Sequence, residues 1–343
     1  MSAPAAAPIS VLFLLLPHSL LLDWAGPAEA FRLANQAALQ RGQPAPFTLQ
    51  LIGPESDTIS SVGALIAQIA PLPAQLPPSC WLVLVGQPDG FDGDTPQQQR
   101  ALTWLRQVGA RLQAGQRLIT ICTGTLMAAK AGLLAGRRAT THHLALDALR
   151  ALAPSCEVVA NRVFVIDTTA PAMLCSSAGI TAGIDLALHL IVMECGAVLA
   201  AHVAQTMVVA LRRSSHDPQL SPFLCHRNHL HPGLHRLQDQ LTQAPAEEWN
   251  VVRMAAIACT SPRHLTRLFQ SHAGIAPLQY LRRIRLAVAH SALRAGSSVT
   301  AAAALAGFAS DTQLRRAWHL LGQPGTPSTQ QASMATNADQ QGV

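Results

Sequence analysis

The chain has 343 residues, of which 49% are hydrophobic, so it is long enough for two domains with ordinary cores and is not globally disordered. Its formal net charge of +6 is unevenly placed, because residues 1–225 carry 13 basic and 13 acidic side chains whereas residues 226–321 carry 11 and 4. A neutral part joined to a basic part indicates that one module faces a polyanion and the other has a different task. The seven cysteines lack the regular spacing of a disulfide framework.

The first apolar run, Val11–Leu16, predicts a buried strand rather than a signal peptide, because no Lys or Arg precedes it and Pro17 interrupts it. No other run approaches the roughly 20 apolar residues that a membrane-spanning helix needs. We therefore expect no membrane partner.

Apolar runs and helical patterns alternate over the first 131 residues. Strands are expected at residues 9–16, 47–52, 81–85 and 118–121, and helices at 26–41, 96–114 and 126–131. Buried strands separated by helices predict an α/β domain with a parallel sheet covered on both faces. Such sheets bind their ligands at the carboxyl ends of the strands.

One of these strands runs into Ile121-Cys122-Thr123-Gly124, and a helix follows at once. A cysteine at such an elbow lies beside the free amides of a helix start, which stabilise a thiolate and lower the thiol pKa. Cys122 is thus the one cysteine with a sequence argument for reactivity. Further along, the small residues of Ser177–Asp185 predict the close-packed entrance of a single long helix reaching Leu211, where Ser177 or Thr181 is also a candidate ligand contact.

Residues 213–232 are rich in Ser, Pro and His without helical periodicity, which predicts an interdomain linker. A set of metal-ligating side chains lies in and beside it: Cys225, His226, His229, His231 and His235. Structural zinc sites normally combine two ligand pairs at defined spacing, and a single cysteine does not supply them. We expect no metal and no cofactor, and a metal-responsive switch is the weakest of our hypotheses.

The stretch from Cys259 to Gln270 predicts a helix-turn-helix unit. Ser261 is a helix cap, Pro262 suits the first helical position, and Leu265, Leu268 and Phe269 share one buried stripe. The outward positions are those of a recognition helix for the DNA major groove: Arg263, His264, Thr266, Arg267 and Gln270.

A second unit follows at residues 299–318, where Ser310 caps a helix whose inward side chains are Leu314, Ala317 and Trp318. Its outward side chains are Thr312, Gln313, Arg315 and Arg316. A long helix, residues 278–294, joins the two units and carries Arg282, Arg283 and Arg285. The predicted C-terminal domain is all α-helical.

Two helix-turn-helix units on a central helix resemble the AraC/XylS family of transcription regulators, and the words "SPRHLTRLFQSHAGIAPLQYLRRIRLAVAHSAL" and "VTAAAALAGFASDTQLRRAWHLLG" carry the resemblance over residues 233–322. By motif position, the resemblance implies base contacts from Arg263, Thr266, Arg267, Thr312, Gln313 and Arg316. Two positions depart from the family pattern. Ala306 stands where cysteine is usual, and Gly325–Ser328 replaces the usual ending, which puts the terminal phosphate contact in doubt.

Residues 9–212 resemble the class I glutamine amidotransferase-like fold, a flavodoxin-like α/β architecture, in the PfpI-like branch found in GlxA-like regulators. The words "LLLDWAGPAEAFRLAN", "ICTGTLMAAKAGLLAGRRATTHH" and "SSAGITAGIDLALHLI" carry this resemblance. It implies an elbow pocket lined by Asp23, Gly86, Cys122, Thr123 and His142. Thr123 stands where a histidine often follows the cysteine, so Cys122 lacks a paired base.

Together the two resemblances imply a sequence-specific DNA-binding regulator whose N-terminal domain is a non-catalytic ligand-sensing or dimerisation module. Double-stranded DNA, a small-molecule effector and a second copy of the chain are the expected partners, and RNA polymerase is a further candidate. The competing hypothesis is a cysteine-dependent amidase, hydrolase or aldehyde-handling enzyme that uses Cys122. Residues 323–343 predict a disordered tail.

Overall fold

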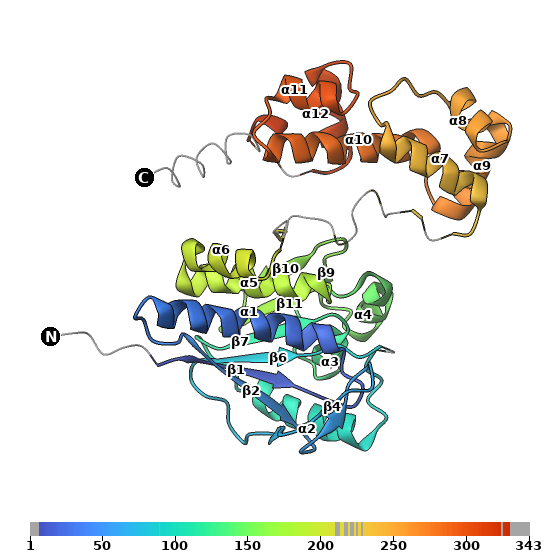
Figure 1. Cartoon of the computed structure of the whole chain (residues 1–343). Helices are drawn as coiled ribbons and strands as arrows, with labels where there is room; N and C mark the ends of the chain where they lie inside the picture. The colour runs from blue at the N-terminus through green and yellow to red at the C-terminus, as the bar shows by residue number, and fades with distance from the viewer. Residues whose placement is uncertain are drawn as a thin grey trace. The chain divides into compact units, whose positions relative to one another are not determined.

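The structure is a computed structural model that describes residues 7–88, 90–209, 213–215, 219, 223, 226–227, 229–323 and 325–329 (Figure 1). They fall into two compact units, residues 1–219 and 220–343. Most of the predicted tail and part of the predicted linker, including Cys225, lie outside the described residues.

A seven-stranded sheet forms the centre of the first unit, in the order β10-β11-β7-β6-β1-β2-β5. Its strands are β1 (Ile9–Leu14), β2 (Phe47–Gly53), β5 (Ala70–Pro71), β6 (Cys80–Leu84), β7 (Arg117–Ile121), β10 (Phe164–Asp167) and β11 (Met173–Ser177). Every pairing is parallel except the one between β10 and β11. Two smaller pairs join β3 (Thr58–Ile59) to β4 (Leu65–Ile66), and β8 (Arg138–Ala139) to β9 (Glu157–Val158).

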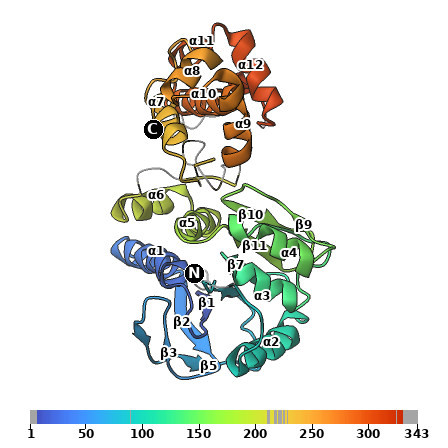
Figure 2. The same cartoon turned by 90° about the vertical axis from the view of Figure 1, so that its right-hand side faces the viewer.

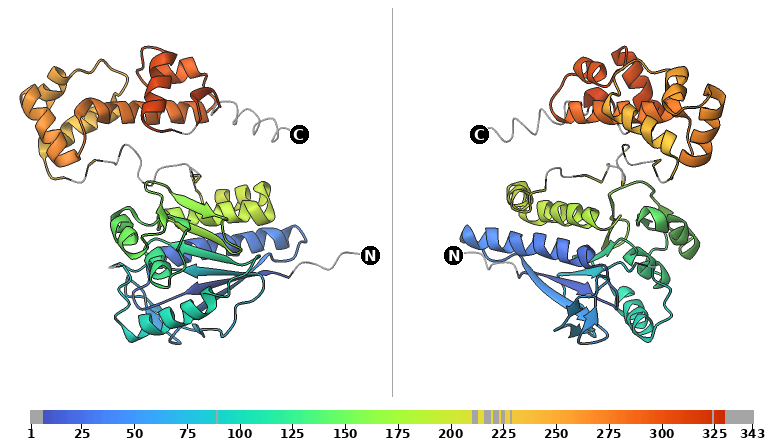
Figure 3. Two further views of the ribbon diagram at one scale, coloured as in Figure 1. Left: turned by 180° about the vertical axis from the view of Figure 1, so that it is seen from behind. Right: turned by 45° about the vertical axis from the view of Figure 1, so that its right-hand side comes forward.

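Helices cover both faces of this sheet, as the predicted α/β class requires (Figure 2). One face carries α1 (Leu21–Gln40), α5 (Thr181–Cys195) and α6 (Ala197–Thr206), and the other carries α2 (Pro96–Gly109), α3 (Gly124–Lys130) and α4 (Leu146–Leu152). Alternate side chains of one strand serve the two cores: Phe13 packs against the first group of helices and Leu14 against the second. Figure 3 shows the same layers from two further directions.

Helix α1 begins five residues earlier than the sequence predicted, at Leu21 rather than residue 26. The Gly26-Pro27 pair, which is typical of a helix start, lies inside the helix. A tertiary contact favours glycine at this position, because a Cβ on Gly26 would come within 2.8 Å of Ile184 Cγ1 on α5. Helix α2 ends at Gly109, five residues before the predicted end at residue 114.

The predicted single helix from the 177–185 segment to Leu211 is wrong. Ser177 ends strand β11, the helix α5 begins at Thr181, and Gly196 with a φ of +86° separates α5 from α6. Glycine adopts such a left-handed backbone without a Cβ penalty, so the break occurs at this residue. The end of the predicted helix, residues 210–211, lies outside the described residues.

The second unit contains α7 (Pro232–Gln243), α8 (Val251–Ile257), α9 (Pro262–Ala273), α10 (Pro277–Arg294), α11 (Val299–Leu305) and α12 (Asp311–Leu320). It has two cores. Helix α10 contributes Tyr280 and Ile284 to the core shared with α7, α8 and α9, and Ala289 and Leu293 to the core shared with α11 and α12. The central helix therefore joins two helix-turn-helix units, as predicted.

Candidate functional site

Helix caps and buried apolar side chains that lie close together in the sequence form the first helix-turn-helix unit. Asn250 caps α8 by accepting the Arg253 N–H at 2.9 Å, and Ser261 caps α9 by accepting the His264 N–H at 3.3 Å. The connection is tight, with Cys259 at a φ of +54°. Leu265 and Phe269 are buried as predicted, whereas Leu268 is only half-buried.

The outward face of α9 matches the predicted recognition surface. Arg263, Thr266, Arg267 and Gln270 are exposed, and His264 is half-buried. The Nδ1 atom of His264 lies 2.9 Å from Nη2 of Arg267. Thr266 Oγ1 donates to the Pro262 carbonyl at 3.1 Å, as helical threonines often do. The hydrogen bond between His264 and Arg267 holds the arginine fork against the helix.

Helix α12 repeats the arrangement. Ser310 accepts the Gln313 N–H at 3.3 Å, and Leu314, Ala317 and Trp318 are buried. The predicted outward side chains are exposed: Thr312, Gln313, Arg315 and Arg316.

Two of these exposed side chains of α12 are held by contacts within the second unit. Gln313 Oε1 accepts the Ala309 N–H at 2.7 Å, and Arg315 Nη2 donates to Ser328 Oγ at 2.9 Å. Arg316 occupies the sixth position after Ser310, as Arg267 does after Ser261.

The central helix contributes rigidity through one of its arginines. Arg285 donates from Nε to the Pro245 carbonyl and from Nη2 to the Glu247 carbonyl, both at 2.8 Å. These bonds tie α10 to the loop before α8. At Gly307, which has a φ of +79°, a Cβ would come within 2.5 Å of Ala246 Cα in the same loop. The loop before α8 therefore packs against both α10 and the turn that precedes α12.

The elbow in the first unit has the predicted sharp turn between β7 and α3. Cys122 adopts a φ of +56°, an unusual conformation for a residue with a side chain. Glycines surround it closely: a Cβ on Gly179 would come within 2.3 Å of Cys122 Cβ, and one on Gly86 within 2.9 Å. A Cβ on Gly124 would come within 2.2 Å of the Leu84 carbonyl oxygen. The chain packs around this thiol and leaves it 4% exposed.

Asp23 lies beside the thiol, as the resemblance implied, and is fully buried. Its Oδ1 accepts the Ile180 N–H at 2.6 Å. Burial raises the pKa of Asp23 to about 6, against the opposing effect of hydrogen bonds from the Ile180 and Gly86 amides and from Cys122. Burial and the Asp23 charge raise the pKa of Cys122 to about 12. The prediction that the helix start lowers the Cys122 pKa is therefore wrong, because desolvation outweighs the amides.

Thr123 and His142, the remaining predicted elbow residues, also bond to groups other than the thiol. Hydrogen bonds from Thr123 lower the pKa of Cys122, but burial outweighs them. Thr123 Oγ1 donates to the Gln87 carbonyl at 2.7 Å and accepts the Gln87 N–H at 2.8 Å. His142 Nδ1 accepts the Leu144 N–H at 3.4 Å, and its ring lies 4.2 Å from that of His143. Burial and His143 lower the pKa of His142. Among the described residues, no hydrogen bond joins His142 to Cys122.

Three side chains beside the elbow were not predictable from any sequence pattern. Thr141 Oγ1 donates to the Cys122 carbonyl at 2.8 Å, and Gln219 Nε2 donates to the Thr141 carbonyl at 2.8 Å. Arg213 forms an ion pair with Asp185 on α5. Threonine and glutamine occur throughout the chain, and only the tertiary contacts single out these two.

Native full-length protein treated with iodoacetamide at pH 8 should be alkylated at Cys259 well before Cys122. Cys259 is exposed, whereas Cys122 is buried with a pKa raised to about 12, so very little thiolate is available. Peptide mass spectrometry over time measures both sites. Equal alkylation rates in the folded protein would contradict the closed elbow and support the enzyme hypothesis.

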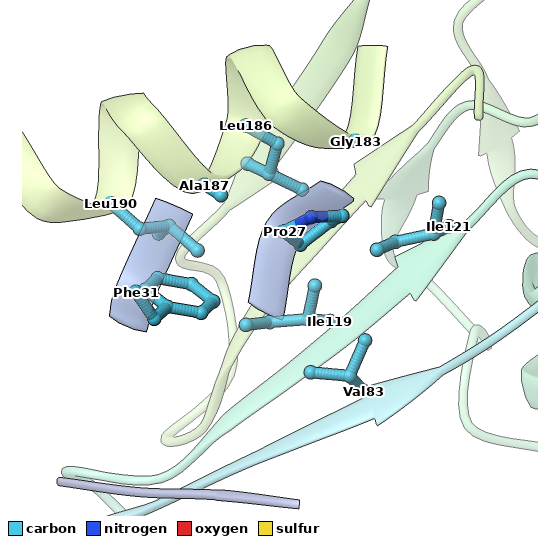
Figure 4. Close-up of a pocket in the computed structure, with 9 residues that line it drawn as sticks. All are labelled: Pro27, Phe31, Val83, Ile119, Ile121, Gly183, Leu186, Ala187 and Leu190. Carbon is cyan, nitrogen blue, oxygen red and sulfur yellow. The ribbon is translucent and has the colours of Figure 1, made fainter. Parts of the chain in front are cut away.

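Two cavities of the first unit do not include Cys122 in their linings. A gap of about 10 Å³ between α1, α5 and the sheet is lined by apolar residues including Pro27, Phe31 and Ile119 (Figure 4). It holds one water molecule at most, so it is a packing defect. A surface cavity of about 350 Å³ includes Leu76, Arg111 and Gln116 in its lining, near the amino ends of β6 and β7.

The histidines near the start of α7 meet a further histidine from α9. The rings of His229 and His235 lie 4.4 Å apart, and those of His231 and His272 lie 5.4 Å apart. His231 caps α7, because its Nδ1 accepts the Leu234 N–H at 3.3 Å. Within the described residues, no group of three or more ligands is placed to hold a metal ion. The same residues contain no helix both long and apolar enough to cross a membrane.

Comparison with known proteins matches both units. A helix-turn-helix domain model matches residues 254–321, and a DJ-1/PfpI family model matches residues 80–193. The HTH-type transcriptional regulator GbdR of Pseudomonas aeruginosa is 29% identical over 88% of this chain and 79% of its own. The HTH-type transcriptional regulator GlxA of Rhizobium meliloti is 28% identical over 90% of this chain and 91% of its own.

A solved structure extends the likeness to the fold. A ThiJ/PfpI family protein from Pseudomonas syringae matches with a TM-score of 0.50 at 18% identity, over 74% of this chain and 92% of its own. These comparisons agree with the structure. The regulators are similar over most of their length, and the second unit of this chain contains two capped helix-turn-helix units. The chain belongs to the AraC-type DNA-binding transcriptional regulators that carry a DJ-1/PfpI-like N-terminal domain.

Proposed function

We propose that α9 and α12 enter successive major grooves of operator DNA, with Arg267 and Arg316 each reading a guanine. The observation that carries this proposal is the repeated geometry. Each helix presents an exposed arginine at the sixth position after its capping serine, and α10 fixes both helices in one body. An arginine fork matches the two guanine acceptors in the major groove.

The other outward residues then divide by their contacts. In this proposal, neighbouring bases or phosphates are contacted by the other exposed side chains, which are Arg263, Thr266 and Gln270 on α9 and Thr312 on α12. His264 acts by positioning Arg267. Gln313 and Arg315 are candidate DNA contacts too, although each already has a partner within the second unit.

The N-terminal unit acts, in this proposal, as a non-catalytic module that senses a small molecule, holds a homodimer, or does both. Support comes from the buried, protonated Cys122 thiol and from the lack, among the described residues, of a hydrogen bond between this thiol and His142. A thiol with a raised pKa and no base lacks the chemistry of the competing cysteine-hydrolase hypothesis. The effector site is assigned to the carboxyl ends of the parallel strands, near the elbow. A regulator of this kind works in the cytoplasm and contacts RNA polymerase.

Binding of the purified protein to its own promoter region should remain selective as salt rises from 50 to 200 mM. The basic second unit gives both this duplex and an unrelated one a salt-sensitive phosphate attraction, but only base contacts distinguish them. Fluorescence anisotropy on the two duplexes measures the specificity ratio. Equal affinities at every salt concentration would reduce the second unit to a basic surface and refute sequence-selective regulation.

A further inference from the structure

Arg213, which follows α6, is bound to the first two turns of α5. Its Nε donates to Asp185 Oδ2 and its Nη2 to Thr181 Oγ1, both at 2.8 Å, and its backbone N–H donates to Asp185 Oδ1 at 3.0 Å. Asp185 is 5% exposed, so these charge-assisted bonds form in surroundings of low dielectric constant. Ile180, which directly precedes α5, is the residue whose N–H binds Asp23. Arg213 is thus attached to the start of α5, which lies on the Asp23 side of the elbow.

Gln219 is bound to the other side. Its Nε2 donates to the Thr141 carbonyl at 2.8 Å and to Thr140 Oγ1 at 3.2 Å. Both threonines are fully buried, and Thr141 Oγ1 donates to the Cys122 carbonyl. The Oε1 atom of Gln219 is buried and has no hydrogen-bond partner among the described residues. The Gln219 amide nitrogen therefore donates to two acceptors that are connected to the elbow. The unsatisfied Oε1 atom of the same side chain weakens this attachment.

We propose that Arg213 and Gln219 attach the C-terminal end of the first unit to the elbow, and that an effector with an N–H donor head group releases it by replacing the Gln219 amide on Thr140 and Thr141. Two oxygen acceptors define the chemistry: a primary amide, an ammonium or a guanidinium group fits them. A quaternary ammonium group has no N–H to donate and does not. This inference rests on the sensing role proposed above.

The contacts also predict how such an effector would regulate DNA binding. An effector that binds only when Gln219 has left must favour the released segment, and release must strengthen effector binding by the same factor. The second unit begins directly after Gln219, so attachment of Gln219 shortens the free chain that leads into the DNA-binding unit. Release should therefore raise affinity for the operator.

The test uses the full-length protein and two matched glutamine variants. Gln219→Ala removes the seated amide, whereas Gln205→Ala removes an exposed glutamine of α6 that has no bond to the elbow. We expect Gln219→Ala to speed trypsin cleavage after Arg213, because the protease must extract that side chain, and to tighten operator binding by about fivefold. Asp185→Asn should accelerate the same cleavage. Gln205→Ala should match the wild type, and melting curves check that each variant is folded.

Small probes test the effector class. Acetamide and methylguanidinium should tighten operator binding by the wild type and leave Gln219→Ala unaffected, while tetramethylammonium, which has no N–H, should do nothing. The fastening is wrong if Gln219→Ala and Gln205→Ala behave alike in both assays. The N–H donor class is wrong if neither donor probe acts on the wild type.

Two further outcomes separate the proposals. A probe response that survives in Gln219→Ala but disappears in Arg111→Ala would move the effector to the surface cavity at the amino ends of the strands. A wild-type protein that does not distinguish its promoter region from the unrelated duplex would refute the proposed DNA readout itself, before any variant is compared.

Discussion

Replacing Asp23 by asparagine should stabilise the N-terminal unit by about 3 kcal/mol at pH 8, since a raised carboxyl pKa is a cost of ionisation in the folded state. The pKa of Asp23 is about 6 in the folded chain, against an ordinary value of 3.8. Asparagine keeps an acceptor for the Ile180 amide and carries no charge to bury.

The stability that Asp23→Asn adds to the N-terminal unit should increase as pH rises. Below the ordinary pKa of 3.8, both the folded and the unfolded chain hold the Asp23 proton, so the variant gains nothing. Between pH 3.8 and about 6, only the unfolded chain ionises, and the wild type loses stability as pH rises. About half of the full gain should be present at pH 5, and all of it well above pH 6.

Urea unfolding followed by hydrogen exchange of peptides from β1 and β6 measures this unit separately from the second one. Asp57→Asn is the matched control, because Asp57 is exposed. A gain that is constant from pH 4 to pH 8 would show that asparagine packs better but that Asp23 does not titrate as described.

Arg267→Ala and Arg316→Ala should each cost about 1 to 3 kcal/mol of specific operator binding and relax base preference at one position. The two helices read separate grooves in this proposal, so the costs should be nearly additive in the double variant. Binding to unrelated DNA should change much less, because it depends on phosphate attraction. Anisotropy titrations against operators with single base-pair changes measure both effects.

Arg267→Lys is the sharpest control for this prediction. Lysine keeps the positive charge but lacks the planar fork that meets two guanine acceptors. We expect it to lose base preference as the alanine variant does while keeping the salt dependence of the wild type. A lysine variant with wild-type base preference would make Arg267 a phosphate contact, and loss of binding without altered preference would do the same.

The helix-turn-helix surface was predictable because its signals are local. Ser261 and Ser310 cap their helices through atoms three residues away, and the buried stripes recur at helical spacing. The elbow turn was predictable for the same reason, since Cys122 lies between a short apolar strand and a helix start. Helix ends set by distant packing were not, and α1 begins at Leu21 because Gly26 and Pro27 pack against α5.

The sequence by itself therefore determined the two-module organisation, the parallel α/β class and the outward faces of α9 and α12, because each follows from composition, periodicity or capping within a few residues. Only the tertiary structure decided the chemistry of the elbow. The Asp23 carboxyl meets the Ile180 amide across 157 positions of sequence, and Gln219 meets Thr141 across 78. The desolvation that raises the Cys122 pKa comes from residues far apart in the chain, and it reverses the effect expected from the local helix start.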